Sequence, residues 1–151
     1  MKAAATVQLE GPVEPPIEVR MSPLSPLVGQ HLEYVRLGDA LVLSFSRGSQ
    51  ILIETAAHLT TPDAYTRLLP GDDSSDALAS LLGDVVSTAQ TADDGELTIT
   101  FGAGYELRVT PDPELESWAF TNPDGPLIVC LPGGELAFWA NTRASTTPNA
   151  G

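Results

Sequence analysis

The amino-acid sequence predicts an α+β domain that is mostly antiparallel β. We expect a duplicated three-strand meander forming a curved or two-layer sheet, with one short helix between the halves. Three observations predict this fold. Short runs of alternating apolar residues are separated by frequent turn signals. Residues 41–53 resemble residues 97–109 at a constant offset of 56. A single stretch places leucines at helical spacing.

The first meander is expected from strands over residues 31–37, 40–46 and 50–54, within a repeat spanning about 28–54. The turns between these strands contain Gly38-Asp39 and Arg47-Gly48. Each strand has apolar residues at every second position, which is the period of one sheet face.

The second meander is expected from strands over residues 84–90, 96–101 and 105–109, within a repeat spanning about 82–110. Matched positions share apolar character or a turn glycine. Leu41, Leu43, Phe45, Gly48, Ile51 and Ile53 correspond to Leu97, Ile99, Phe101, Gly104, Leu107 and Val109. Two such copies, stacked or placed edge to edge, would bury both apolar faces.

A helix is expected over residues 74–83, between the two repeats. Leu78, Leu81 and Leu82 share one face, Ser74 or Ser75 can cap the first turn, and Gly83 can end the helix. Three further strands follow over residues 116–120, 126–131 and 135–140. The last two would form a closing hairpin, 126–140, around the Pro-Gly-Gly turn at residues 132–134.

The chain divides into three segments by composition. Residues 1–22 are expected to be a flexible, proline-containing arm, residues 23–142 a single β-rich domain, and residues 143–151 a disordered tail. The start has no apolar run typical of a secretory signal. One cysteine cannot form an internal disulfide, and this agrees with a cytoplasmic location.

The formal net charge is −13. Of the 20 acidic residues, only three lie in residues 1–22 and none lies after residue 142, so the acidity belongs to the domain. Such a charge repels phosphate backbones, and we expect no nucleic-acid or membrane partner. A basic protein is the partner class that this charge would attract; the alternative is that the charge only keeps the protein soluble. Asp72, Asp73 and Asp76, around the start of the helix, are candidate partner-binding residues.

No catalytic residue is expected. Cys130 lies in a run that is apolar on both faces, with no histidine or cation within 12 residues, and is interpreted as a core side chain. His31 opens a strand and His58 is placed in a loop. Two histidines and one cysteine without short spacing do not indicate a zinc site, and the acidic clusters lack calcium-loop spacing. No phosphate or dinucleotide motif indicates a cofactor.

The two tryptophans are further candidates for partner binding. Trp118 and Trp139 lie on separate predicted strands, and tryptophan is enriched among residues that dominate interface energies. Core packing is the alternative for either ring. Along residues 135–140, alternation puts Leu136 and Phe138 on one face and Trp139 on the other.

Several stretches together resemble a family of small actinobacterial proteins that carry a domain of unknown function. These stretches are Leu82-Gly83, residues 95–101, Trp118, residues 122–125 and residues 128–139. The most specific one is V-C-L-P-G-G-x-L-A-x-W at residues 129–139. The resemblance implies a compact β-rich domain over about residues 26–140 and carries no catalytic residue to this chain.

The sequence therefore favours a non-enzymatic cytoplasmic protein that binds another protein as an adaptor or interaction module. One alternative is a toxin-neutralising, immunity-type protein, to which size, acidity and β content give a looser similarity. A second alternative is a small enzyme that uses clustered carboxylates. Association of two copies through an edge strand of the sheet is a further prediction.

Overall fold

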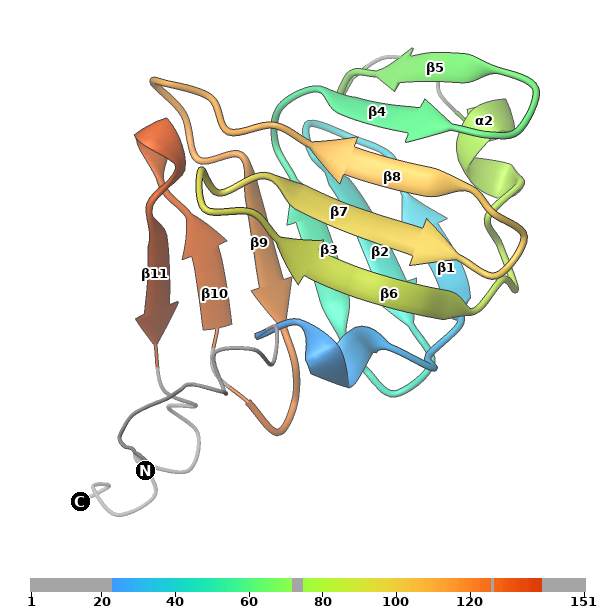
Figure 1. Ribbon diagram of the computed structural model, residues 1–151, viewed down its shortest axis with the longest axis horizontal. Coiled ribbons are helices and arrows are strands. Elements are labelled where there is room, and N and C mark those ends of the chain that lie inside the picture. Colours follow the sequence, from blue (N-terminus) through green and yellow to red (C-terminus); the bar gives the residue numbers. More distant parts are fainter. Residues whose placement is uncertain (1–22, 72–74, 126, 140–151) are drawn as a thin grey trace, which may run out of the picture.

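A computed structural model of the chain describes residues 23–71, 75–125 and 127–139 (Figure 1). The strands are β1 (Leu32–Arg36), β2 (Leu41–Phe45), β3 (Gln50–Ile53), β4 (Ala57–Thr60), β5 (Tyr65–Leu68), β6 (Val86–Thr91), β7 (Leu97–Phe101), β8 (Glu106–Val109), β9 (Trp118–Thr121), β10 (Leu127–Cys130) and β11 (Leu136–Trp139). The helical elements are the α-helix α2 (Ser75–Ala79) and two 3-10 turns, η1 (Ser25–Leu27) and η2 (Pro132–Gly134). The predicted fold class, mostly antiparallel β with one short helix between the halves, is confirmed.

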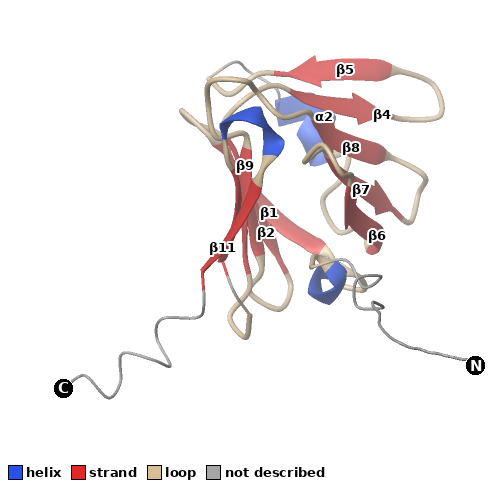
Figure 2. Ribbon diagram, turned by 60° about the vertical axis from the view of Figure 1, so that its left-hand side comes forward, coloured by secondary structure: helices blue, strands red, loops and turns tan. Residues whose placement is uncertain are grey.

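The strands form two antiparallel sheets. One has six strands in the order β1-β2-β3-β9-β10-β11, and the other has five in the order β5-β4-β8-β7-β6. The sheets are stacked as two layers, and β10 and β11 extend beyond the five-stranded layer (Figures 1 and 2). Side chains from both facing surfaces form one core, including Phe45, Phe101, Trp118, Phe120 and Leu107. Burial of these facing rows supplies the main driving force for the fold.

The predicted duplication is present as an approximate twofold relationship. Strands β1-β2-β3 and β6-β7-β8 pair with the same register: Leu32 lies opposite Phe45, and Val86 lies opposite Phe101. In both pairs the register shifts immediately afterwards. The two halves also exchange backbone hydrogen bonds. The Gly29 N–H donates to Val86 at 2.9 Å, and the Gly83 N–H donates to Leu32 at 2.8 Å.

Each half ends in the sheet of the other half. The hairpin β4-β5 pairs with β8, and β9-β10 pairs with β3. The two junctions have the same register, since Ala57 lies opposite Val109 and Trp118 lies opposite Ile53. Ala57 is therefore the structural counterpart of Trp118. This exchange of hairpins binds the two halves into one domain.

Strands β4 and β5 were not predicted, and the placement of His58 in a loop is wrong because His58 lies in β4. The sequence A-H-L-T is short and contains one large aliphatic residue, so its local β signal is weak. Its strand state depends on pairing with β8, which is distant in sequence.

The helix is shorter than predicted, because α2 ends at Ala79. The following leucines repeat a turn seen in the first half. The Leu81 N–H donates to Leu78, as the Leu27 N–H donates to Leu24, at 3.0 and 2.9 Å. Three of these leucines, Leu24, Leu27 and Leu81, are fully buried. The spacing of Leu78 and Leu81, which predicted a longer helix, thus arises because one leucine is buried in the helix and the other in the turn that follows it.

Candidate functional site

The predicted partner-binding residues do not form one site. Asp72 and Asp73 lie outside the described residues, and Asp76 is exposed in the first turn of α2. Trp118 and Trp139 lie on β9 and β11, two strands apart in the same sheet.

Trp118 is a core residue, only 1% exposed, and its indole N–H donates to the Gly95 carbonyl at 3.0 Å. Because Trp118 is buried, its side chain offers no surface to a partner. Core packing, the alternative given for this ring, describes Trp118 correctly, and it is no longer a candidate for partner binding. Trp139 is 47% exposed and remains accessible. Phe138 is 54% exposed. Phe138 lies opposite the buried Ile128, whereas Trp139 lies opposite Leu127, so the two rings face opposite sides of the sheet.

Cys130 is fully buried, in agreement with its interpretation as a core side chain. Its Sγ contacts the carbonyl oxygens of Gly95 at 3.6 Å and Leu131 at 3.8 Å. Burial raises the pKa of the thiol, a hydrogen bond with Ser117 opposes that rise, and the charge of Asp94 adds to it. A thiol with a raised pKa holds little of the thiolate that nucleophilic attack requires.

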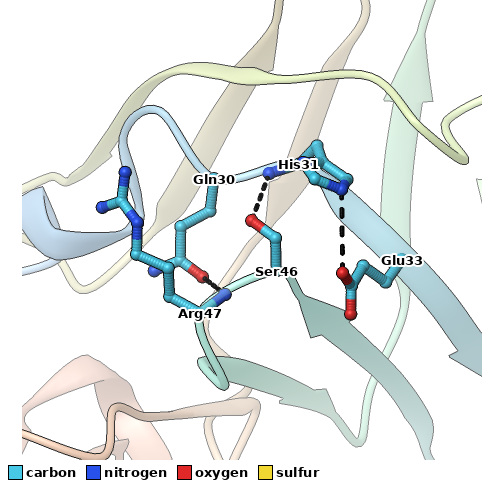
Figure 3. A network of polar contacts seen from close by, with 5 residues as sticks. All are labelled: Gln30, His31, Glu33, Ser46 and Arg47. Atoms are coloured by element: carbon cyan, nitrogen blue, oxygen red, sulfur yellow. Dashed lines mark hydrogen bonds and ion pairs between the residues drawn. The ribbon is translucent and has the colours of Figure 1, made fainter.

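The histidines occupy separate polar networks. His31 Nε2 lies 3.7 Å from Glu33 Oε2, and the His31 backbone N–H donates to Ser46 (Figure 3). In the same view the Gln30 side chain accepts from the Arg47 N–H at 2.8 Å. His58 Nδ1 lies 2.6 Å from the Tyr65 hydroxyl. Among the residues that the structure describes, no three His, Cys, Asp or Glu side chains gather as a metal ion would require.

A row of aliphatic side chains crosses the outer face of the six-stranded sheet, the face turned away from the core. Cross-strand pairing places its members side by side in the order Val42, Leu52, Ala119, Val129 and Ala137. We call this set the aliphatic row. Val42 and Val129 are buried but do not belong to the core cluster between the sheets. No described helix or strand lies over this face in Figure 2.

Aromatic residues stand at the two ends of this face. Tyr34 on β1 lies opposite Ser44, and Trp139 on β11 lies opposite Leu127, both on the outer side of the sheet. Tyr34 is 51% exposed. The members of the aliphatic row are buried or partly buried, so these two rings are the most exposed apolar side chains beside it.

Two carboxylates border the aliphatic row along one side. Glu54 directly follows β3 and continues the ladder by donating its N–H to Ser117. Glu135 directly precedes β11, and its backbone carbonyl accepts a hydrogen bond from the Leu131 N–H. Alternation places Glu54 on the face of Leu52 and Glu135 on the face of Ala137. Both residues are exposed.

The corresponding row on the five-stranded sheet has different chemistry. The shared registers relate Val42, Leu52, Ala119 and Val129 to Thr98, Arg108, His58 and Arg67. The fold therefore accepts polar side chains at these positions, and the aliphatic row is a property of one sheet only.

A small apolar groove of about 260 Å³ lies at the β1 edge of the same sheet. It is lined by Glu33, Tyr34, Val35, Leu37, Leu78, Ala79 and Leu82. In the other half, the residues equivalent to Tyr34 and Leu37 are Thr88 and Thr91. Tyr34 thus joins the groove to the outer face.

The aliphatic row was not predicted. Its signal in the sequence is continuous apolar character where alternation would be expected, as in Leu41-Val42-Leu43 and in Leu127-Ile128-Val129-Cys130. Such runs indicate strands with two apolar faces, but they do not tell which face meets the core. The edge strands are β1 and β11 in the six-stranded sheet and β5 and β6 in the five-stranded sheet, and association through an edge stays a prediction.

Comparison with known proteins identifies a matching family. The sequence model of a family described as a family of unknown function (DUF6188) matches residues 23–140. Neither a curated protein nor a solved structure matches the chain. Within the described part of the chain, no helix combines the length and the apolar character needed to cross a bilayer.

Proposed function

The chain belongs to this family of unknown function, and from that premise we propose that it is a non-enzymatic, cytoplasmic interaction module. It binds another protein through the outer face of the six-stranded sheet. The observation that carries the proposal is the aliphatic row, which the symmetry-related sheet replaces by polar and basic side chains. A soluble sheet that faces only water is normally polar on that side.

The accessible anchors of the interface are Tyr34 and Trp139. Both rings are about half exposed, and they flank the aliphatic row, in which Val42 and Val129 are buried. Aromatic anchors beside an apolar surface that excludes water are typical of the residues that dominate binding energy.

The partner is a basic protein with an apolar strip. Glu54 and Glu135 border the aliphatic row, and the chain carries a net charge of −13. Such a charge speeds association with a basic surface and opposes binding to an acidic one. Neutralisation of a basic toxin would be one form of this binding. An enzyme with clustered carboxylates gains no support from the described residues.

Two finer features complete the proposal. We further propose that the stretch V-C-L-P-G-G-x-L-A-x-W, residues 129–139, marks an actinobacterial family; the same stretch supplies Val129, Ala137 and Trp139 to the proposed binding face. We place the protein in the cytoplasm because its one cysteine is a free, buried thiol.

The test uses the tagged full chain to capture proteins from an extract of its natural host, followed by purification of the captured protein and measurement of its affinity. Variant Tyr34→Ala/Trp139→Ala removes both anchors. Phe138→Ala is the matched control, since Phe138 is adjacent to Trp139 and similarly exposed but faces the other side of β11.

We expect a basic protein that binds wild type and Phe138→Ala alike, and binds the double variant at least about tenfold more weakly. Equal weakening by Phe138→Ala, or no weakening by the double variant, would contradict the proposal. If light scattering shows that wild type self-associates through this face and the double variant does not, the occupant is a second copy and the proposed partner is wrong.

A further inference from the structure

A second surface, on the opposite side of the molecule, has the chemistry of an anion site. On the outer face of the five-stranded sheet, Arg67 on β5 lies opposite His58 on β4, and His58 lies opposite Arg108 on β8. We call these three residues the basic row. The three strands lie side by side at the front of Figure 1. Directly paired residues on one sheet face have Cβ atoms about 5 Å apart, so the three side chains can reach one small ligand.

The basic row is unusual for this chain. Residues 23–139 contain four arginines among many acidic residues, and two of the four lie here with a histidine between them. Glu106 is two residues from Arg108 on the same strand, yet among the described residues no acidic side chain forms an ion pair with Arg67 or Arg108. Both arginines are exposed.

The fold does not require these charges. The equivalent residues on the six-stranded sheet are Val129, Ala119 and Leu52, which follow the same pairing. Two arginines on one sheet face, only one strand apart, repel each other and do not stabilise the sheet. A row that the fold could fill with aliphatic residues, and that instead holds two arginines with a histidine between them, indicates binding of a negatively charged group.

His58 is held in a fixed orientation by Tyr65. The Tyr65 hydroxyl lies 2.6 Å from Nδ1, and the two rings stack with centroids 5.9 Å apart and an interplanar angle of 13°. When the hydroxyl donates to Nδ1, the ring hydrogen lies on Nε2, which then acts as a donor. The imidazole thus adds a positioned N–H between two guanidinium groups.

We propose that the basic row binds a compact oxyanion of the phosphate class. Guanidinium groups bind such oxyanions through paired, charge-assisted hydrogen bonds, and His58 contributes a third donor. The site suits a single phosphate group rather than a nucleic-acid chain, because the net charge of −13 would repel an extended polyanion. The group comes either as the free ion or attached to another molecule.

The test is a titration of the full chain with inorganic phosphate at constant ionic strength, in which binding is measured from the NMR chemical shifts of the backbone amides. The variants are Arg67→Gln and Arg108→Gln. Arg36→Gln is the matched control, because it removes the same charge from the edge strand β1 of the other sheet. Urea unfolding of each variant checks that the fold is retained.

We expect saturable shifts centred on β4, β5 and β8. The affinity for phosphate should fall on the order of tenfold in Arg67→Gln or Arg108→Gln and stay unchanged in Arg36→Gln. A second titration with O-phosphoserine distinguishes the sources: tighter binding than inorganic phosphate indicates an attached group, and weaker binding indicates the free ion. Shifts that do not saturate, or equal weakening by Arg36→Gln, would overturn the proposal. Because the basic row shares no residue with the aliphatic row, either proposal can fail alone.

Discussion

Gly95 and Gly134 pack backbone against backbone, and neither position has room for a side chain. A Cβ on Gly95 would overlap the carbonyl of Gly134, and a Cβ on Gly134 would overlap the carbonyl oxygen of Asp94. Both glycines also have positive φ, 95° and 103°. Gly95 belongs to the turn between β6 and β7, and Gly134 ends η2 just before β11. The contact therefore fastens the closing hairpin of one sheet to a turn of the other.

Replacing Gly134 by alanine should destabilise the domain strongly. Positive φ costs a residue with a Cβ about 1–2 kcal/mol, and the overlap with Asp94 forces the two loops apart. We expect a loss of about 3 kcal/mol or more in the free energy of unfolding, measured by urea denaturation.

Gly133→Ala is the control for this prediction. Gly133 has a φ of 87°, but nothing lies within 4 Å of its potential Cβ. It should lose only the backbone term, about 1–2 kcal/mol. Equal losses in the two variants would show that the contact between Gly95 and Gly134 contributes nothing beyond local strain.

Replacing Trp118 by phenylalanine should also destabilise the core. The change removes the hydrogen bond to the Gly95 carbonyl, which is buried, and leaves a cavity. We expect a loss of about 2 kcal/mol or more in unfolding free energy. Trp139→Phe should lose less than about 0.5 kcal/mol, since Trp139 is half exposed.

Fluorescence distinguishes the two tryptophans directly. Trp139→Phe retains the buried indole, and its emission should be blue-shifted and resist quenching by iodide. Trp118→Phe retains the exposed indole, with red-shifted, quenchable emission. The reverse pattern would contradict the assignment of Trp118 to the core and Trp139 to the outer face.

Gln30 and Asp84 are symmetry-related residues with unequal importance. Gln30 is 1% exposed and accepts from the Arg47 N–H at 2.8 Å while donating to Pro26 and Ser49. Asp84 accepts from the Ala103 N–H at 3.1 Å in the equivalent turn, at an exposed contact. Gln30→Ala removes all three of these hydrogen bonds at a buried position. We therefore expect a loss of about 2 kcal/mol or more in unfolding free energy.

Asp84→Ala should lose about 1 kcal/mol or less, because the hydrogen bond with Ala103 is exposed and water can replace the carboxylate there. Urea denaturation of both variants is the measurement. A larger loss for Asp84→Ala than for Gln30→Ala would show that burial does not decide the value of these bonds.

The sequence predicts the parts of this fold that repeat locally. Alternation and turn glycines predicted the strands of both meanders, and the offset of 56 paired β2-β3 with β7-β8. The exchange of hairpins was not predictable, because the offset between Ala57 and Trp118 differs from 56 and because the large Trp118 in β9 corresponds to the small Ala57 in β4.

The candidate sites depend on pairings between distant strands. Trp139 was chosen as a candidate for partner binding from its residue type alone. The aliphatic row and the basic row each take residues from at least three strands, so neither leaves a short motif in the sequence. The close contact of Gly95 and Gly134 is hidden for the same reason, since each glycine alone reads as an ordinary turn residue.

Cys130 should make the stability of the protein depend on alkaline pH. Burial raises the pKa of its thiol in the folded state, with a smaller rise from Asp94 and a partial reversal by Ser117. The folded chain therefore holds this proton more tightly than the unfolded chain, and losing the proton favours unfolding. The contribution of the thiol is complete below the pKa of an unfolded cysteine, about 8.5, and is lost as the pH rises through the higher folded value.

The unfolding free energy of the wild type, measured by urea denaturation, should thus fall more between pH 7 and pH 10 than that of Cys130→Ala. The two proteins share every other titrating group, so the difference in slope reports the thiol alone. The native thiol should also react with a disulfide reagent at pH 8 far more slowly than the thiol of the urea-unfolded chain, because it is buried and protonated. Parallel pH profiles for wild type and Cys130→Ala, together with fast native labelling, would mean that Cys130 is accessible to solvent and that its pKa is not raised by burial.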